Sequence, residues 1–376
     1  MNDSNVNIVG LSDEILLTIF KKLNNFDVLY SLVGVNHKLD RIACDIAFTR
    51  DVDLMMISSN EGDVSTTDAI LDRFCSDIIP RIHNNMESLT VQASLLQRVL
   101  HANSYPNLHK LTLVNLKLSM DSHIFDENLL FDPTFKHQIS ELIIKSDYKI
   151  SSTSEQKFLT DVYVKIFVLL PNLKYFDSDV YYDYYFSQAL TSDLSFPKYY
   201  SSNIAYLRMK MCYFDDCLYL LDGRLSQLHT FIVDLKHIHE PSAIHLSSSR
   251  LIRNSLKLIN NAKSLLHLKC FSLYVHTPMV EFDSLVIPLL HRMLHLEKLT
   301  LSVHVRHRSS FIDGIHLDKN ILNISVSPPR RRLRRNHKQS TENSHDAETL
   351  SKSSLHDHAS SIDRTSSNEV IEDVDL

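Results

Sequence analysis

The chain has 21 histidines, and histidine is a common ligand of zinc in proteins. His291 and His295 are four residues apart on a predicted helix, a spacing that places two rings on one face. No third histidine or carboxylate follows them at a recognised ligand spacing. A proline comes directly after His239-Glu240, so the zinc-protease pattern H-E-x-x-H is absent there. The histidines therefore predict no metal site and no bound cofactor.

The cysteines do not form a recognisable chemical set either. They number five and are scattered: Cys44, Cys75, Cys212, Cys217 and Cys270. An odd, dispersed set is typical of thiols in a reducing compartment and not of a disulfide framework. Cys212 and Cys217 have no second pair nearby, so they predict thiols of a packed core. No Cys/His or Ser/His/Asp set can be assigned from spacing.

Glycine is scarce, and this scarcity excludes several activities. The chain has five glycines, at positions 10, 34, 62, 223 and 314, and no two lie within six residues of each other. A glycine-rich phosphate loop, a dinucleotide-binding fingerprint and a G-x-S-x-G nucleophile turn are therefore all absent. With no catalytic residue to assign, we expect the chain not to be an enzyme.

Composition limits the class of protein. A length of 376 residues with 44% apolar content is enough for a large core or two domains. The net charge of −6 argues against nucleic acid as a partner, and no apolar run is long enough to span a membrane. The first ten residues lack the features of a secretory signal. We expect a protein of the cytoplasm, the nucleus or both.

Eight short segments share the pattern apolar-x-x-apolar-x-apolar and predict strands. They are Met86–Val91, Leu108–Leu113, Ile139–Ile144, Leu173–Ser178, Ile204–Met209, Leu228–Val233, Leu268–Leu273 and Leu296–Leu301. Helical patterns lie between them. The segments resemble leucine-rich repeats, although their spacing of 22 to 40 residues makes the array degenerate. The alternative is an ordinary α/β domain in which Leu-x-Leu recurs through composition.

Residues 11–45 contain apolar residues at helical spacing and match a known pattern. The matching positions are Leu11, Glu14, Ile15, Leu16, Ile19, Phe20 and Leu23. The segment resembles an F-box, the helical module that docks on the adaptor subunit of an SCF-type ubiquitin ligase. It departs from the family at Ser12, where proline is usual, and at Leu39, which stands in place of a tryptophan. The alternative is an amphipathic helical hairpin that only starts the fold.

Together the two resemblances imply an α+β multidomain protein. Residues 1–10 would be a flexible N-terminus, and residues 11–48 an all-α F-box of three short helices. Residues 49–324 would form an irregular α/β leucine-rich-repeat-like solenoid. Residues 325–376 are poor in apolar residues and would be a disordered tail. Within the tail, Arg330–Arg335 is compatible with a nuclear-import signal, an anion-binding patch or a solvated charge run.

The resemblance implies a substrate-recognition subunit that serves ubiquitin-dependent degradation. Its F-box would bind the adaptor, and through it cullin, by way of Leu11, Glu14, Ile15, Leu16, Ile19, Phe20, Leu23, Val35 and Leu39. A protein target, of unknown identity, would bind the concave side of the strands, where side chains alternate away from the core. That side would present Lys110, Lys145, Tyr206, Arg208, Lys210, Tyr274 and Lys298. The alternatives are an F-box scaffold without ubiquitylation and a repeat protein whose N-terminal hairpin is merely a cap.

Overall fold

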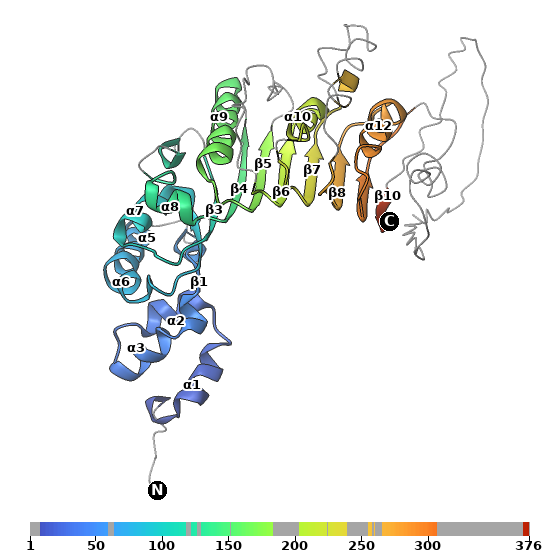
Figure 1. The fold of residues 1–376 in the computed structure, drawn as a ribbon. Coiled ribbons are helices and arrows are strands. Elements are labelled where there is room, and N and C mark those ends of the chain that lie inside the picture. Colours follow the sequence, from blue (N-terminus) through green and yellow to red (C-terminus); the bar gives the residue numbers. More distant parts are fainter. Residues whose placement is uncertain are drawn as a thin grey trace, which may run out of the picture.

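The chain folds into one curved sheet with helices along its outer side (Figure 1). The computed structural model describes residues 8–58, 64–117, 122–125, 129–150, 152–182, 203–223, 225–238, 255–257, 259, 265–306 and 371–375. Figure 1 shows the strands on the inner side of an arc and the helices α9, α10 and α12 on its outer side. A group of short helices lies at the N-terminal end of the arc.

Ten strands form a single sheet in the part of the chain that the structure describes, and their spatial order is their order in the chain. The first nine are parallel. They are β1 (Asp51–Asp53), β2 (Ser88–Gln92), β3 (Lys110–Val114), β4 (Glu141–Ile150), β5 (Tyr175–Tyr182), β6 (Tyr206–Met211), β7 (Thr230–Leu235), β8 (Cys270–Val275) and β9 (Lys298–Ser302). Parallel neighbours need a crossover between them, which the intervening helices and loops provide.

The register of the sheet explains why the repeated pattern folds in this way. One row of paired residues runs across eight strands: Leu89, Leu111, Leu142, Phe176, Leu207, Phe231, Phe271 and Leu299. Every member of this row is buried. Because strand side chains alternate between two faces, the residues on either side of each member point away from the helices. A single apolar face therefore continues from strand to strand and forms the core.

The helices cover this apolar face and differ widely in length. The N-terminal ones are η1 (Ile8–Gly10), α1 (Asp13–Phe20), α2 (Asn25–Leu32), α3 (His37–Ala43) and α4 (Ile46–Thr49). Those between strands are η2 (Met55–Ser58), α5 (Val64–Arg73), η3 (Phe74–Ile78), α6 (Ile79–Ile82), η4 (Ala93–Leu95), α7 (Leu96–Ala102), η5 (Ser122–Phe125), α8 (Pro133–Gln138), α9 (Thr153–Leu169), α10 (Phe214–Leu220), η7 (Phe282–Val286) and α12 (Ile287–Leu290). On α9, Phe167 packs edge-on against Phe176 of β5, with ring centroids 5.7 Å apart.

The N-terminal helices, which we call the helical cap (residues 8–50), pack directly on the first units of the sheet. Phe26 of α2 stacks on Phe74 of η3 with 4.8 Å between ring centroids. The guanidinium of Arg73 lies 4.6 Å from the ring centroid of Tyr30 and donates a hydrogen bond to the Val33 carbonyl. The buried residues of the cap and of the sheet belong to one continuous hydrophobic cluster. The cap is therefore not a separate domain.

This continuity corrects the expected fold class. The α+β multidomain arrangement, with an all-α F-box followed by a solenoid, is wrong: the chain is an α/β protein built on one largely parallel sheet. Helices of four to eight residues cannot bury a core among themselves, so they use the end of the sheet as their packing partner.

The opposite end of the sheet also differs from expectation. Strand β10 (Ile371–Asp375) lies within the segment predicted to be a disordered tail, and it pairs with β9 in antiparallel orientation. Most of that segment, including Arg330–Arg335, lies outside the described residues. Among the helices that the structure describes, none combines the length and the apolar character needed to cross a bilayer.

Candidate functional site

Three of the four α-helices of the cap, α2, α3 and α4, begin at residues whose side chains accept hydrogen bonds from backbone amides of the first turn. The Asn24 side chain accepts a hydrogen bond from the amide of Phe26 at the start of α2. Asn36 does the same for two amides of α3. Ser12 is the first residue before α1, but its hydroxyl caps no backbone amide. The pKa of Glu14 is lowered by a hydrogen bond from its own amide and by one from Ser12.

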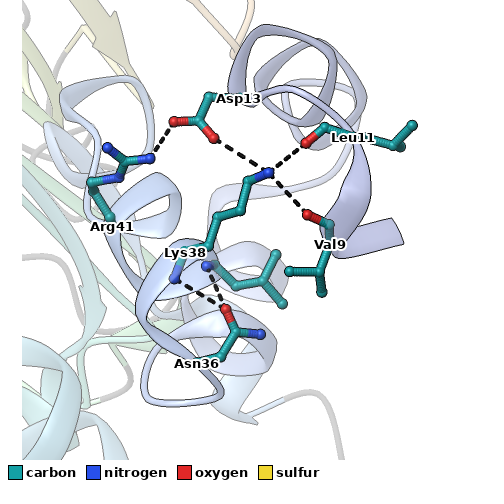
Figure 2. A network of polar contacts seen from close by, with 7 residues as sticks. Val9, Leu11, Asp13, Asn36, Lys38 and Arg41 are labelled. Carbon is teal, nitrogen blue, oxygen red and sulfur yellow. Dashed lines mark hydrogen bonds and ion pairs between the residues drawn. The ribbon is translucent and has the colours of Figure 1, made fainter. Parts of the chain in front are cut away.

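A polar network holds the first helix of the cap against the third (Figure 2). The ammonium group of Lys38 on α3 donates to the carbonyl of Val9 at 2.9 Å and also to that of Leu11. It lies 3.7 Å from the carboxylate of Asp13, which also pairs with Arg41. The network ties η1 and the start of α1 to α3, and so it fixes which side of α1 faces outward.

The outward side of α1 is apolar. Ile15, Ile19 and Leu23, which we call the apolar stripe, are 49%, 40% and 51% exposed. They are spaced four residues apart and therefore lie along one side of the helix and its C-terminal turn. Val35, in the turn before α3, is 57% exposed. Such a row of large exposed aliphatic side chains on one element is a feature of interaction surfaces.

The structure divides the residues predicted to bind an adaptor into two groups. Ile15, Ile19, Leu23 and Val35 are exposed, as is Glu14, and Leu11 is half-buried against the core. By contrast, Leu16, Phe20 and Leu39 are buried, at 0%, 4% and 6% exposure. These three side chains hold the cap together and do not belong to its surface. Leu39 therefore cannot act as a substitute for an exposed tryptophan.

The second candidate surface is the inner face, by which we mean the alternate residues of β3–β9 that point away from the helices. Its first row consists of Lys110, Glu141, Tyr175, Tyr206, Thr230, Cys270 and Lys298, which pair in register. All seven residues predicted to contact a target lie on this face: Lys110, Lys145, Tyr206, Arg208, Lys210, Tyr274 and Lys298. The pairing register places them together over several neighbouring strands.

Most of the predicted cations on the inner face are already paired across strands. Arg208 lies 3.6 Å from the carboxylate of Asp177, and Lys210 pairs with Asp179. Lys110 lies 3.5 Å from Glu141. Two aspartates on β5 therefore neutralise Arg208 and Lys210. The inner face is an alternation of charges and not a cationic patch.

Two features at the centre of the inner face stand out. The rings of Tyr175 and Tyr206 stack with their centroids 4.1 Å apart and an interplanar angle of 7°. Two residues further along the same strands lies Asp177, which is only 8% exposed although it belongs to the inner face. Burial raises the pKa of Asp177, and the nearby guanidinium of Arg208 acts in the opposite direction. A buried carboxylate beside a stacked aromatic pair is an unusual combination on an open sheet face.

Sequence reasoning missed Asp179 and His276 as members of this surface. Asp179 lies on β5 beyond the six-residue motif, because that strand extends to Tyr182. His276 follows β8 directly, and its Nε2 lies 2.5 Å from the carboxylate of Asp234. The same period-2 alternation that placed Lys145, Lys210 and Tyr274 on this side, applied to β5 and continued past β8, identifies both positions.

The predicted histidines and cysteines do not come together in the described part of the chain. No group of three or more His, Cys, Asp or Glu side chains gathers among the described residues in a way that could hold a metal ion. His291 follows the end of α12, and His295 lies in the turn before β9. None of the five cysteines forms a disulfide, and burial raises the pKa of the Cys217 thiol.

The sequence was compared with known proteins in two ways. No model of a protein family matches the chain, and a search of curated proteins finds no relative. The case for a function therefore comes from the residues and the geometry of the apolar stripe and the inner face.

Proposed function

We propose that this chain is the substrate-recognition subunit of an SCF-type ubiquitin ligase. In this proposal the apolar stripe of the cap docks on the adaptor subunit, which links the chain to cullin, while the inner face holds a target protein. The observation that carries the proposal is the division within α1. Leu16 and Phe20 face the core, and the other apolar side chains of the F-box-like pattern, Ile15 and Ile19, face outward. Burying them requires a partner.

The chain itself would supply no catalytic group. Ubiquitin transfer would be accelerated because the complex holds the target close to the loaded conjugating enzyme, which raises their effective concentration. The inner face suits this role because its central residues come from neighbouring strands of a well-packed sheet, and a rigid surface loses little entropy on binding. The role implies action in the cytoplasm, the nucleus or both.

A second candidate is a scaffold that binds the adaptor, or a variant of it, without promoting ubiquitylation. The position of Leu39 favours it: this side chain is 6% exposed, so the surface lacks the large anchor that the F-box pattern usually ends with. A smaller contact area predicts weaker docking. Recovery of cullin and accumulation of a target upon depletion of the chain distinguish the ligase from the scaffold.

Capture of the adaptor from solution tests the proposal. The full chain and an Ile15→Asp/Ile19→Asp variant are compared for recovery of purified adaptor and cullin. Both substituted side chains are exposed, so the variant keeps its core. The control is Ile46→Asp, which introduces one aspartate in place of an isoleucine at a 58% exposed position of α4.

Recovery by wild type and by the control, but not by the double variant, supports docking through the apolar stripe. Equal recovery by all three chains would show that the adaptor does not dock on the apolar stripe. Failure of the wild-type chain to capture the adaptor rejects the proposal, and the helices then serve only to close the end of the sheet.

A further inference from the structure

Asp177 is a carboxylate that the folded chain leaves incompletely satisfied. Its side chain is 11% exposed, and Oδ1 is buried without accepting a hydrogen bond among the described residues. Oδ2 lies 3.6 Å from the guanidinium of Arg208, which is longer than a good hydrogen bond. Buried polar atoms are nearly always hydrogen-bonded, and an exception needs an explanation. Asp177 therefore has an acceptor that the described residues leave unsatisfied.

The surroundings of Asp177 restrict what that donor can be. Tyr175 and Tyr206 lie two residues earlier on the same strands, about 7 Å away along the strand direction. Their rings stack on one another, and the register neighbour of Tyr206 on the next strand is Thr230, which has a short side chain. A planar cation stacks favourably on a tyrosine ring face. Arg208 is 43% exposed, so it can move aside.

We propose that the centre of the inner face binds an extended segment of a partner protein through one arginine, whose guanidinium hydrogen-bonds to Asp177 and packs on the ring of Tyr206. Arginine fits better than lysine because its planar fork satisfies both carboxylate oxygens and also stacks on an aromatic ring. This inference rests on the proposed function only in taking the inner face as the target-binding surface. An acidic or phosphorylated target fits the inner face less well, because Asp177 and Asp179 neutralise the cations Arg208 and Lys210 that such a target would need.

Selection from a phage-displayed library of random twelve-residue peptides tests the proposal. The immobilised full chain is compared with an Asp177→Asn variant and with a matched Asp234→Asn variant. Asp234 lies on the same face and is paired with His276. We expect wild type and Asp234→Asn to enrich arginine at one position, and Asp177→Asn to lose this enrichment. No enrichment with wild type, or the same arginine preference with Asp177→Asn, would overturn the proposal.

A double-mutant cycle on one selected peptide adds a test that does not depend on the variant alone. The peptide is made with arginine or with citrulline, its neutral isostere, and each form is titrated against wild type and Asp177→Asn. We expect either single change to weaken binding about tenfold or more, since hydrogen bonds to charged groups are strong. The second change should then add little. Two independent, additive losses contradict the contact.

These experiments are separate from the test of adaptor docking. The Ile15→Asp/Ile19→Asp variant should select the same peptides as wild type, because the apolar stripe lies on the helical cap and not on the inner face. A chain that captures the adaptor but selects no arginine peptide rejects only the present inference. A chain that selects arginine peptides without capturing the adaptor keeps the binding site and rejects the ligase role.

Discussion

The hydroxyl of Tyr163 on α9 lies 2.7 Å from the hydroxyl of Ser178 on β5, inside the core. In the same row of the sheet, the neighbouring residues Ile144 and Met209 are apolar, so Ser178 is the polar exception in an otherwise apolar row. The pair explains how a serine can occupy a core position: the hydroxyl of Tyr163 provides a hydrogen-bond partner for the hydroxyl of Ser178.

Removal of the Tyr163 hydroxyl should therefore destabilise the fold. Tyr163→Phe takes this partner from Ser178, and we expect the free energy of unfolding to fall by about 1–3 kcal/mol. Urea unfolding followed by circular dichroism measures the change. Adding Ser178→Ala to the variant should recover part of the loss, because no buried hydroxyl then remains. A double variant less stable than the sum of both single changes contradicts this explanation.

The aromatic cluster around Phe176 predicts a second, larger effect. Phe176 is fully buried, and the rings of Tyr163 and Phe167 meet it edge-on at 5.9 and 5.7 Å between centroids. Phe176→Ala should lower the free energy of unfolding by about 3–5 kcal/mol, through lost burial and the cavity that remains. Tyr148→Ala, at a 39% exposed position of β4, is the control and should change stability little. A small loss at Phe176 would mean that the core collapses around the missing ring.

Much of the sheet could be predicted from the sequence. The repeated apolar pattern marks Leu89, Leu111 and Leu142 as equivalent, and the structure pairs them in one row. Strand position follows from this local periodicity. The prediction of a separate all-α domain at the N-terminus was wrong, because periodicity identifies an apolar face but not the surface that covers it. Strand β10 was missed for a similar reason: the composition of Ile371–Asp375 gives no information about the open edge of β9 that pairs with it.

For the two candidate surfaces, the sequence predicted some of the exposed residues but not their burial pattern or their ion pairs. Ile15 and Leu16 are adjacent and both apolar, and the sequence alone does not tell which one faces the core; the structure buries Leu16 and exposes Ile15. On the inner face, alternation identified Arg208 and Lys210 as surface residues. The ion pairs with Asp177 and Asp179 depend on the register between β5 and β6, which single-strand patterns do not contain.

Lys38 should control the order of the first turn of the cap. Lys38→Met keeps the length of the side chain but removes its donation to the carbonyls of Val9 and Leu11. We expect faster amide hydrogen exchange in residues 8–12 with little change in the sheet. Local opening of this segment then breaks fewer contacts and so costs less free energy. Exchange measured by mass spectrometry provides the readout. Lys21→Met, at an exposed position after α1, is the control, and equal effects of both variants would exclude the network as the cause.

The stability of the chain should depend on pH through Asp177. Because burial raises its pKa, the folded state takes up a proton at Asp177 more readily than the unfolded chain does, so the ionised form destabilises the fold. This destabilisation is present above the folded-state pKa and disappears as the pH falls below the unfolded-state pKa. Asp177→Asn should therefore be at least as stable as wild type at about pH 7, and its advantage should shrink towards about pH 4. Urea unfolding of both chains across this range measures the difference. The opposite outcome is an Asp177→Asn chain that is less stable than wild type at neutral pH, with a deficit that shrinks on acidification. It would show that the carboxylate stabilises the fold through Arg208, and it would contradict the idea that Asp177 is an unsatisfied group that a partner binds.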